Sequence, residues 1–176
     1  PRYRRYRLEV WRRQRRYWSP GTLADALSVA THRQTELTEV FFYHGASDRI
    51  AAATALLSGA YAKRKPMTVF APDHEVADAI DRSLWSSSQL SFIPHCRADS
   101  PLAAETPILI ADRLESVPPG ERLMNLGREI PAGFERFQSL IEVVGQATDD
   151  REAARERVRR YRELGHEVRY FDLSNR

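Results

Sequence analysis

Arginines are the residues whose number and spacing in this 176-residue chain point most clearly to chemistry. Six of them fall within residues 151–162, in the stretch DDREAARERVRRYRELGHEVRYF. A guanidinium group binds carboxylates and phosphates through charge-assisted hydrogen bonds, often two at a time. The cluster therefore indicates an acidic partner.

The spacing of these arginines predicts a stripe along one edge of a helix over residues 149–164. At about 100° per residue, four of them fall within about 80° of one another. We call this set the arginine stripe: Arg151, Arg155, Arg159 and Arg162. An apolar face that includes Val158 adjoins the stripe. Glutamates at i,i+3 and i,i+4 spacing are placed to neutralise part of it. An ordinary salt-bridged surface and a binding site therefore both remain open.

Two further arginines of the same helix, Arg157 and Arg160, lie away from the arginine stripe. We expect both to be exposed and solvated, as charged residues on helix surfaces usually are. At the start of the helix, Asp149 and Asp150 are predicted to supply the N-cap and a second negative charge that suits the helix dipole.

The remaining reactive residues do not form a catalytic, cofactor or metal site. The chain has no G-x-x-x-x-G-K-[ST] or G-x-G-x-x-G motif, and the HGAS segment (44–47) has one glycine and no lysine, so it predicts a turn and helix cap. His95 and Cys96 are adjacent in sequence and make a poor chelate, with no second pair at zinc-ligand spacing. Serines 86–88 lack the glycines of a nucleophile elbow. We expect no catalytic residue, no cofactor and no metal.

Apolar runs alternate with helical patterns along residues 37–176, which predicts an α/β fold. Strands are expected at 37–44, 67–72, 92–95, 107–112, 122–127, 139–145 and 166–173. Helices are expected after Asp48, after Asp73 and over 149–164. This order predicts a three-layer domain with a mainly parallel sheet. Such folds often bind nucleotides, so an α/β enzyme with an unrecognised site stays an alternative.

The positive charge of the chain is concentrated in its first residues. Residues 1–34 carry nine arginines against Glu9 and Asp25, hence +7, whereas the whole chain carries +3, so the rest carries −4. We expect residues 1–36 to be a basic extension outside the fold, and residues 37–176 to form the domain. Aromatic side chains are interleaved with these arginines, as in binders of single-stranded nucleic acid, which leaves direct binding of that kind open.

The cysteine content and the apolar runs of the sequence bear on the cellular compartment. The chain has one cysteine, Cys96, which fits a reducing environment. It has no apolar run of about 18 residues and no pattern of a secretion signal. We therefore expect a cytoplasmic protein without a membrane partner.

Several segments together resemble a known family from about residue 37 to the end. They are TEVFFYH, SLWSSSQLSFIPHCRAD, PILIAD, NLGREIPAGFERFQSLIEVVG and AARERVRRYRELGHEVRYFDL. In order and spacing they resemble the chi subunit of the bacterial DNA polymerase III holoenzyme. The resemblance implies a non-catalytic clamp-loader accessory with a nucleotide-binding type of fold that lacks the phosphate loop. It also implies a place in the replisome, where contact with DNA is mainly indirect.

The resemblance also implies partners and site residues. The family pairs with the psi subunit, which tethers it to the clamp loader, and grips the acidic C-terminal tail of single-stranded DNA-binding protein, which ends in Pro-Phe. Carried over, tail binding falls to the arginine stripe and to Phe92 as the aromatic of the pocket. Val158 stands where better-known members have a tyrosine. Phe134 and Phe137, in REIPAGFERF (128–137), are candidates for psi binding, although core packing is expected for at least one of them.

Overall fold

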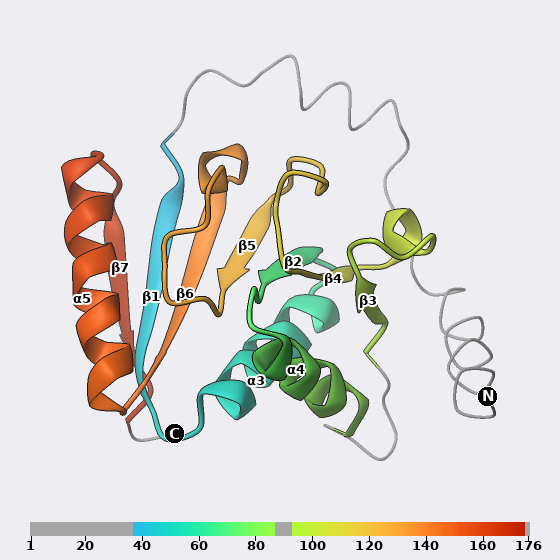
Figure 1. Cartoon of the computed structure of the whole chain (residues 1–176), viewed down its shortest axis with the longest axis horizontal. Coiled ribbons are helices and arrows are strands. Elements are labelled where there is room, and N and C mark those ends of the chain that lie inside the picture. Colours follow the sequence, from blue (N-terminus) through green and yellow to red (C-terminus); the bar gives the residue numbers. More distant parts are fainter. Residues whose placement is uncertain (1–36, 87–92, 175–176) are drawn as a thin grey trace.

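Seven parallel strands form one continuous sheet in the computed structural model, which describes residues 37–86 and 93–174. The order across the sheet is β3-β4-β2-β5-β6-β1-β7, and all neighbouring strands run parallel (Figure 1). Their bounds are β1 Glu39–Ala46, β2 Met67–Phe70, β3 His95–Arg97, β4 Ile108–Ala111, β5 Arg122–Asn125, β6 Ser139–Gly145 and β7 Val168–Asp172. The predicted parallel α/β fold is confirmed.

The third strand differs from its predicted position. The sequence predicts residues 92–95, whereas β3 begins at His95, which pairs with Ile108 of β4. Pro94 explains the shift, because a proline has no backbone N–H to donate to the ladder of a sheet. Phe92 lies outside the residues that the structure describes.

Aspartates begin two of the helices, as the sequence predicts. Helix α3 spans Arg49–Ala62, and the Asp48 carboxylate accepts a hydrogen bond from the Ala51 N–H at 3.0 Å. Helix α4 spans His74–Ser86, and Asp73 accepts from the Glu75 N–H at 2.7 Å. Each carboxylate satisfies an N–H that has no partner within the helix.

The predicted cap of the last helix is wrong. Helix α5 spans Thr148–Glu163, and Ala147 takes the N-cap position without a side-chain hydrogen bond. The Asp150 carboxylate lies in the first turn and accepts from the Gly145 N–H at 2.6 Å, so it ties the helix to the end of β6. Both predicted aspartates still lie in the first turn, where the helix dipole favours negative charge.

The helices cover opposite faces of the sheet, which confirms the three layers. Side chains of α3 and α4, such as Leu57 and Ile80, pack in one core cluster that includes Val143 of β6. The next residue of β6, Val144, points to the other face and packs against α5. None of the helices within the described ranges is long and apolar enough to cross a membrane.

A tight turn returns the chain from α5 to the sheet edge. Gly165 has φ of 86°, a left-handed conformation that glycine adopts without a steric penalty, and its N–H donates to the Arg162 carbonyl at 3.0 Å. Strand β7 therefore runs back alongside the helix, and the two elements lie next to each other at one edge of the molecule (Figure 1).

Candidate functional site

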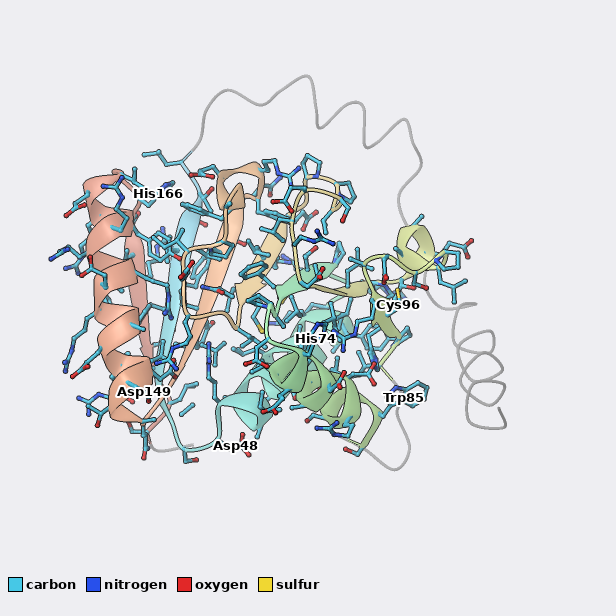
Figure 2. The ribbon with its side chains drawn as sticks, in the orientation of Figure 1. Asp48, His74, Trp85, Cys96, Asp149 and His166 are labelled. Carbon is cyan, nitrogen blue, oxygen red and sulfur yellow. The ribbon has the colours of Figure 1, made fainter. Side chains whose placement is uncertain are left out.

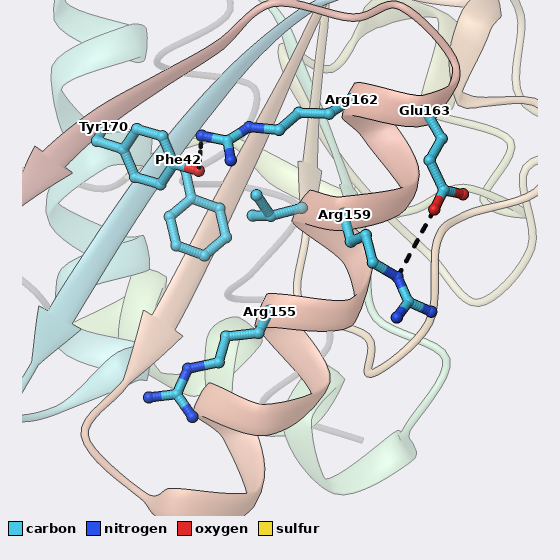
Figure 3. Close-up of a pocket in the computed structure, with 7 residues that line it drawn as sticks. Phe42, Arg155, Arg159, Arg162, Glu163 and Tyr170 are labelled. Carbon is cyan, nitrogen blue, oxygen red and sulfur yellow. Dashed lines mark hydrogen bonds and ion pairs between the residues drawn. The ribbon is translucent and has the colours of Figure 1, made fainter.

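A hollow of about 620 Å³ opens between α5 and the edge of the sheet. Figure 3 shows this hollow, which is lined by Phe42, Arg155, Val158, Arg159, Arg162, Glu163 and Tyr170. The structure therefore brings together Val158 and three arginines of the predicted arginine stripe. The fourth, Arg151, lines a neighbouring hollow with His44 and Ser174. We call the first of these the α5–β7 hollow.

The floor of the α5–β7 hollow is apolar. Phe42 of β1 and Val158 of α5 belong to a small buried cluster with Val144 and Ala154. The ring of Phe42 lies 5.4 Å from that of Tyr170, which is 45% exposed and forms a wall on the β7 side. An aromatic or aliphatic side chain entering the hollow would be removed from water at this floor.

The three arginines at the rim of the hollow differ in how far their charges are already paired. Arg162 donates a hydrogen bond from Nη2 to the Tyr170 hydroxyl at 3.0 Å and lies 5.6 Å from the centre of that ring. Arg159 is paired with Glu156 and Glu163. No ion pair joins Arg155 to another of residues 37–86 and 93–174. Figure 3 shows Arg155 and Arg162 extending towards the β7 side, whereas Arg159 turns towards Glu163. Arg155 and Arg162 are thus the cations best placed for an anionic ligand.

Arg157 is not the solvated residue that the sequence predicts, and this expectation is wrong. Its side chain is 3% exposed and forms a buried ion pair with Glu142 of β6, with Nη2 and Oε2 2.8 Å apart. The same carboxylate accepts from the Tyr161 hydroxyl at 2.6 Å and from the Asn125 side chain at 2.9 Å. A buried charge needs this degree of pairing, because removal from water is costly.

The buried network raises the pKa values of Tyr161 and Arg157 and fixes the position of α5. Burial and the nearby Glu142 carboxylate raise the pKa of Tyr161, so its hydroxyl remains a donor. Burial by itself would lower the pKa of Arg157, but Glu142 more than offsets this and the pKa is raised. Arg157 also donates to the Arg128 carbonyl at 2.8 Å. The inner side of α5 is therefore locked to β6 while the arginine stripe stays on the outside.

Phe134 and Phe137 are both core residues. They are 1% and 2% exposed and pack with Leu140 and Tyr161, and the Phe134 and Tyr161 rings are 5.4 Å apart. The expectation of core packing for at least one of these rings is confirmed. Neither ring is available on the surface of this chain.

At the position where open α/β sheets often bind phosphates, the protein's own side chains bond to the backbone beside a hollow of about 340 Å³. Between the starts of α3 and α5, Arg49 donates from Nε to the Val143 carbonyl at 2.7 Å and lies 3.7 Å from the Asp150 carboxylate. The Asp150 carboxylate in turn accepts a hydrogen bond from the Gly145 N–H. Arg49 and the Gly145 N–H are therefore already bonded to Asp150, which leaves fewer donors there for the phosphates of a nucleotide.

The other reactive residues are scattered. Figure 2 shows His74, Cys96 and His166 on separate parts of the domain. In the part of the chain that the structure describes, no group of three or more His, Cys, Asp or Glu side chains is placed to hold a metal ion. Burial raises the pKa of the Cys96 thiol, which disfavours the reactive thiolate.

Two residues of the α5–β7 hollow, Phe42 and Tyr170, were not expected from the sequence. Alternation along a strand predicts which of its residues share a face of the sheet. It does not predict which other element that face contacts. The meeting of these two residues depends on the pairing of β1 with β7, which sets Phe42 opposite Tyr170.

Comparisons with known proteins match most of the chain. The family model for the DNA polymerase III chi subunit, HolC, matches residues 37–169. The DNA polymerase III subunit chi of Pseudomonas aeruginosa is 31% identical over 137 residues, which cover 74% of this chain and 93% of that protein.

Proposed function

This chain belongs to the DNA polymerase III chi subunit family, and from that premise we propose that its α5–β7 hollow binds the acidic C-terminal tail of single-stranded DNA-binding protein. The protein would act as a non-catalytic accessory of the replicative polymerase. The observation that carries the proposal is the position of Arg155 and Arg162 over an apolar floor at an exposed surface.

The chemistry of the tail matches that of the hollow. Aspartate side chains and the terminal carboxylate suit Arg155 and Arg162, because charge-assisted hydrogen bonds are stronger than neutral ones. A terminal phenylalanine suits the floor of Phe42 and Val158, with Tyr170 as an aromatic neighbour. Arg159 already forms ion pairs with Glu156 and Glu163, so we propose that it contributes less to tail binding. Arg151 lies further along the helix and would meet tail residues distant from the phenylalanine.

We also propose that the protein joins the clamp loader through the psi subunit, as its family implies. Because the rings of Phe134 and Phe137 are buried in this chain, we propose that other residues contribute to the psi-binding face. Phe92 remains a proposed pocket residue from the family resemblance.

Replacing Arg155 by alanine should weaken binding of a synthetic tail peptide by about tenfold or more. The loss corresponds to one charge-assisted hydrogen bond, worth about 1.5–3 kcal/mol. Fold stability should change little because Arg155 is exposed and has no ion-pair partner among the described residues. Isothermal titration calorimetry measures the affinity, and thermal unfolding measures the stability.

Arg160→Ala is the matched control, since Arg160 is an exposed arginine of the same helix that does not line the hollow. It should retain the affinity of the unaltered protein to within about threefold, the scale of an exposed ion pair. Equal affinities for Arg155→Ala and the unaltered protein would contradict the assignment of the hollow.

Direct binding of single-stranded nucleic acid is a second candidate, favoured by the +7 charge and interleaved aromatics of residues 1–34. Deletion of residues 1–36 should abolish binding to a mixed-sequence oligonucleotide while tail affinity and melting temperature stay unchanged. Binding by the complete chain should fall steeply with salt, as expected for phosphate contacts. Oligonucleotide binding that survives the deletion would instead place the nucleic-acid site within residues 37–176.

A further inference from the structure

Strand β7 has an open edge. It is the last strand of the sheet and pairs with β1 on one side, and no other strand in the described part of the chain pairs with its outer side. Its residues 169–172 are all exposed. An edge of this kind presents unpaired N–H and C=O groups, which can serve as a template for an added strand.

The hydrogen bonds to β1 define which backbone groups face outwards. Val40 donates to the Glu167 carbonyl at 3.1 Å, and Leu173 donates to the His44 carbonyl at 2.8 Å. In a parallel pair with this register, the N–H groups of Arg169 and Phe171 point to β1. Those of Val168, Tyr170 and Asp172 therefore point to the open side, and so do their carbonyls.

This edge lacks two of the features that usually prevent strand addition, a proline and a bulge. It contains no proline, and its register with β1 runs without a bulge. Tyr170 and Phe171 are 45% and 38% exposed, one on each face. The one cation of the strand, Arg169, is held by Glu39 and Glu167 at 3.0 and 3.1 Å. Neither a proline nor a bulge therefore blocks pairing along Val168–Asp172.

The arginine stripe runs beside this edge from the middle of β7 to just beyond its end. At one end Arg162 hydrogen-bonds Tyr170, and at the other Arg151 lines a hollow with Ser174, just beyond β7. At 1.5 Å per residue, the helix covers about 16 Å between these two arginines. At about 3.3 Å per residue, an extended peptide of roughly five residues covers the same length.

We propose that an acidic peptide binds this protein as an added strand on the open edge of β7, with every second side chain directed towards the arginine stripe. Charge complementarity selects an acidic segment, and the backbone supplies hydrogen bonds that are independent of side chains. This inference rests on the proposed function and specifies how the tail is held. Side chains at the intervening positions would lie on the Phe171 face.

Amide hydrogen exchange, measured by NMR with and without the synthetic tail peptide, tests the pairing directly. Binding should slow exchange at Val168, Tyr170 and Asp172 by at least about tenfold, because their N–H groups become paired. Exchange at Arg169 and Phe171 should change much less, since these groups are already bonded to β1. Peptide binding without this alternation would overturn strand addition and leave the proposed function standing. Absence of peptide binding would overturn both.

A set of tail peptides, each methylated at one backbone nitrogen, provides a second measurement. Methylation at alternate positions should reduce affinity by at least about tenfold, because the added strand then lacks a donor to β7. Methylation at the intervening positions is the control and should have little effect. Equal tolerance at all positions would overturn the inference. So would protection of the outer β7 amides that rises with protein concentration in the absence of peptide, because a second copy would then occupy the edge.

Discussion

Replacing Arg157 by methionine is expected to lower the free energy of unfolding by about 3–5 kcal/mol, because it leaves the buried Glu142 carboxylate without its ion-pair partner. Methionine retains an unbranched apolar stem, so loss of packing adds little. The Arg128 carbonyl also loses its donor. Urea denaturation followed by circular dichroism measures the change.

Two further variants give this prediction its controls. Arg160→Met changes an exposed arginine of the same helix and should alter stability by no more than about 0.5 kcal/mol. Combining Arg157→Met with Glu142→Gln should recover part of the loss, since the amide removes the unpaired buried charge while its oxygen can still accept from the Tyr161 hydroxyl and the Asn125 side chain. A single variant as stable as the Arg160 control would show that the Glu142–Arg157 pair is not what holds α5 to the sheet.

Reversing both charges over the hollow, with Arg155→Glu and Arg162→Glu together, should reduce tail affinity by at least about hundredfold. Two charge-assisted contacts are lost, each worth about 1.5–3 kcal/mol, and repulsion is added. The residual affinity should no longer decrease as salt rises, because salt then screens repulsion. Titrations at low and high ionic strength measure both effects.

The matched control makes the same change in net charge elsewhere. Arg113 and Arg160 are 79% and 58% exposed and do not line the α5–β7 hollow. Replacing both by glutamate should reduce affinity by less than about tenfold, the scale expected for distant screened charges. Equal losses in the two double variants would mean that overall charge, rather than the hollow, determines binding.

The sequence predicts best those features that depend on local spacing. Asp48 and Asp73 cap their helices because a cap needs only a short polar side chain three residues before a free N–H. Helical periodicity also groups Arg155, Arg159 and Arg162, which line one hollow beside α5, whereas Arg151 lines the next.

Arg157 shows where local reasoning fails. With Arg151 at 0°, Arg157 lies at about 240° around the helix axis, within the arc of apolar residues. Glu142 likewise interrupts an otherwise apolar strand. Each charge alone is a misplaced residue, and together they form one buried pair. Distance from the arginine stripe therefore does not predict that an arginine is exposed. A charged residue within an apolar arc instead indicates a buried ion pair.

The lining of the α5–β7 hollow could not be predicted from the periodicity of the sequence. Phe42 and Tyr170 meet because β7 returns beside β1, and the order of strands in a sheet is a property of the whole chain. The position of β3 depends in turn on Pro94, which delays pairing to His95. The existence of the strands was predictable, and β6 has the predicted bounds 139–145, whereas the neighbours of each strand and the start of β3 were not predictable.

The pairing of β1 has a consequence for synthesis on the ribosome. Both neighbours of β1 come late in the chain: Glu39 pairs with Ser139, about 100 residues further on, and Val40 pairs with Val168. At roughly 5–20 residues per second, the nascent EVFFYHGA segment waits several seconds or longer with both edges open. Translation that stops before β6 leaves an apolar strand that cannot be paired natively, so we expect incomplete chains of this protein to aggregate or to need chaperones.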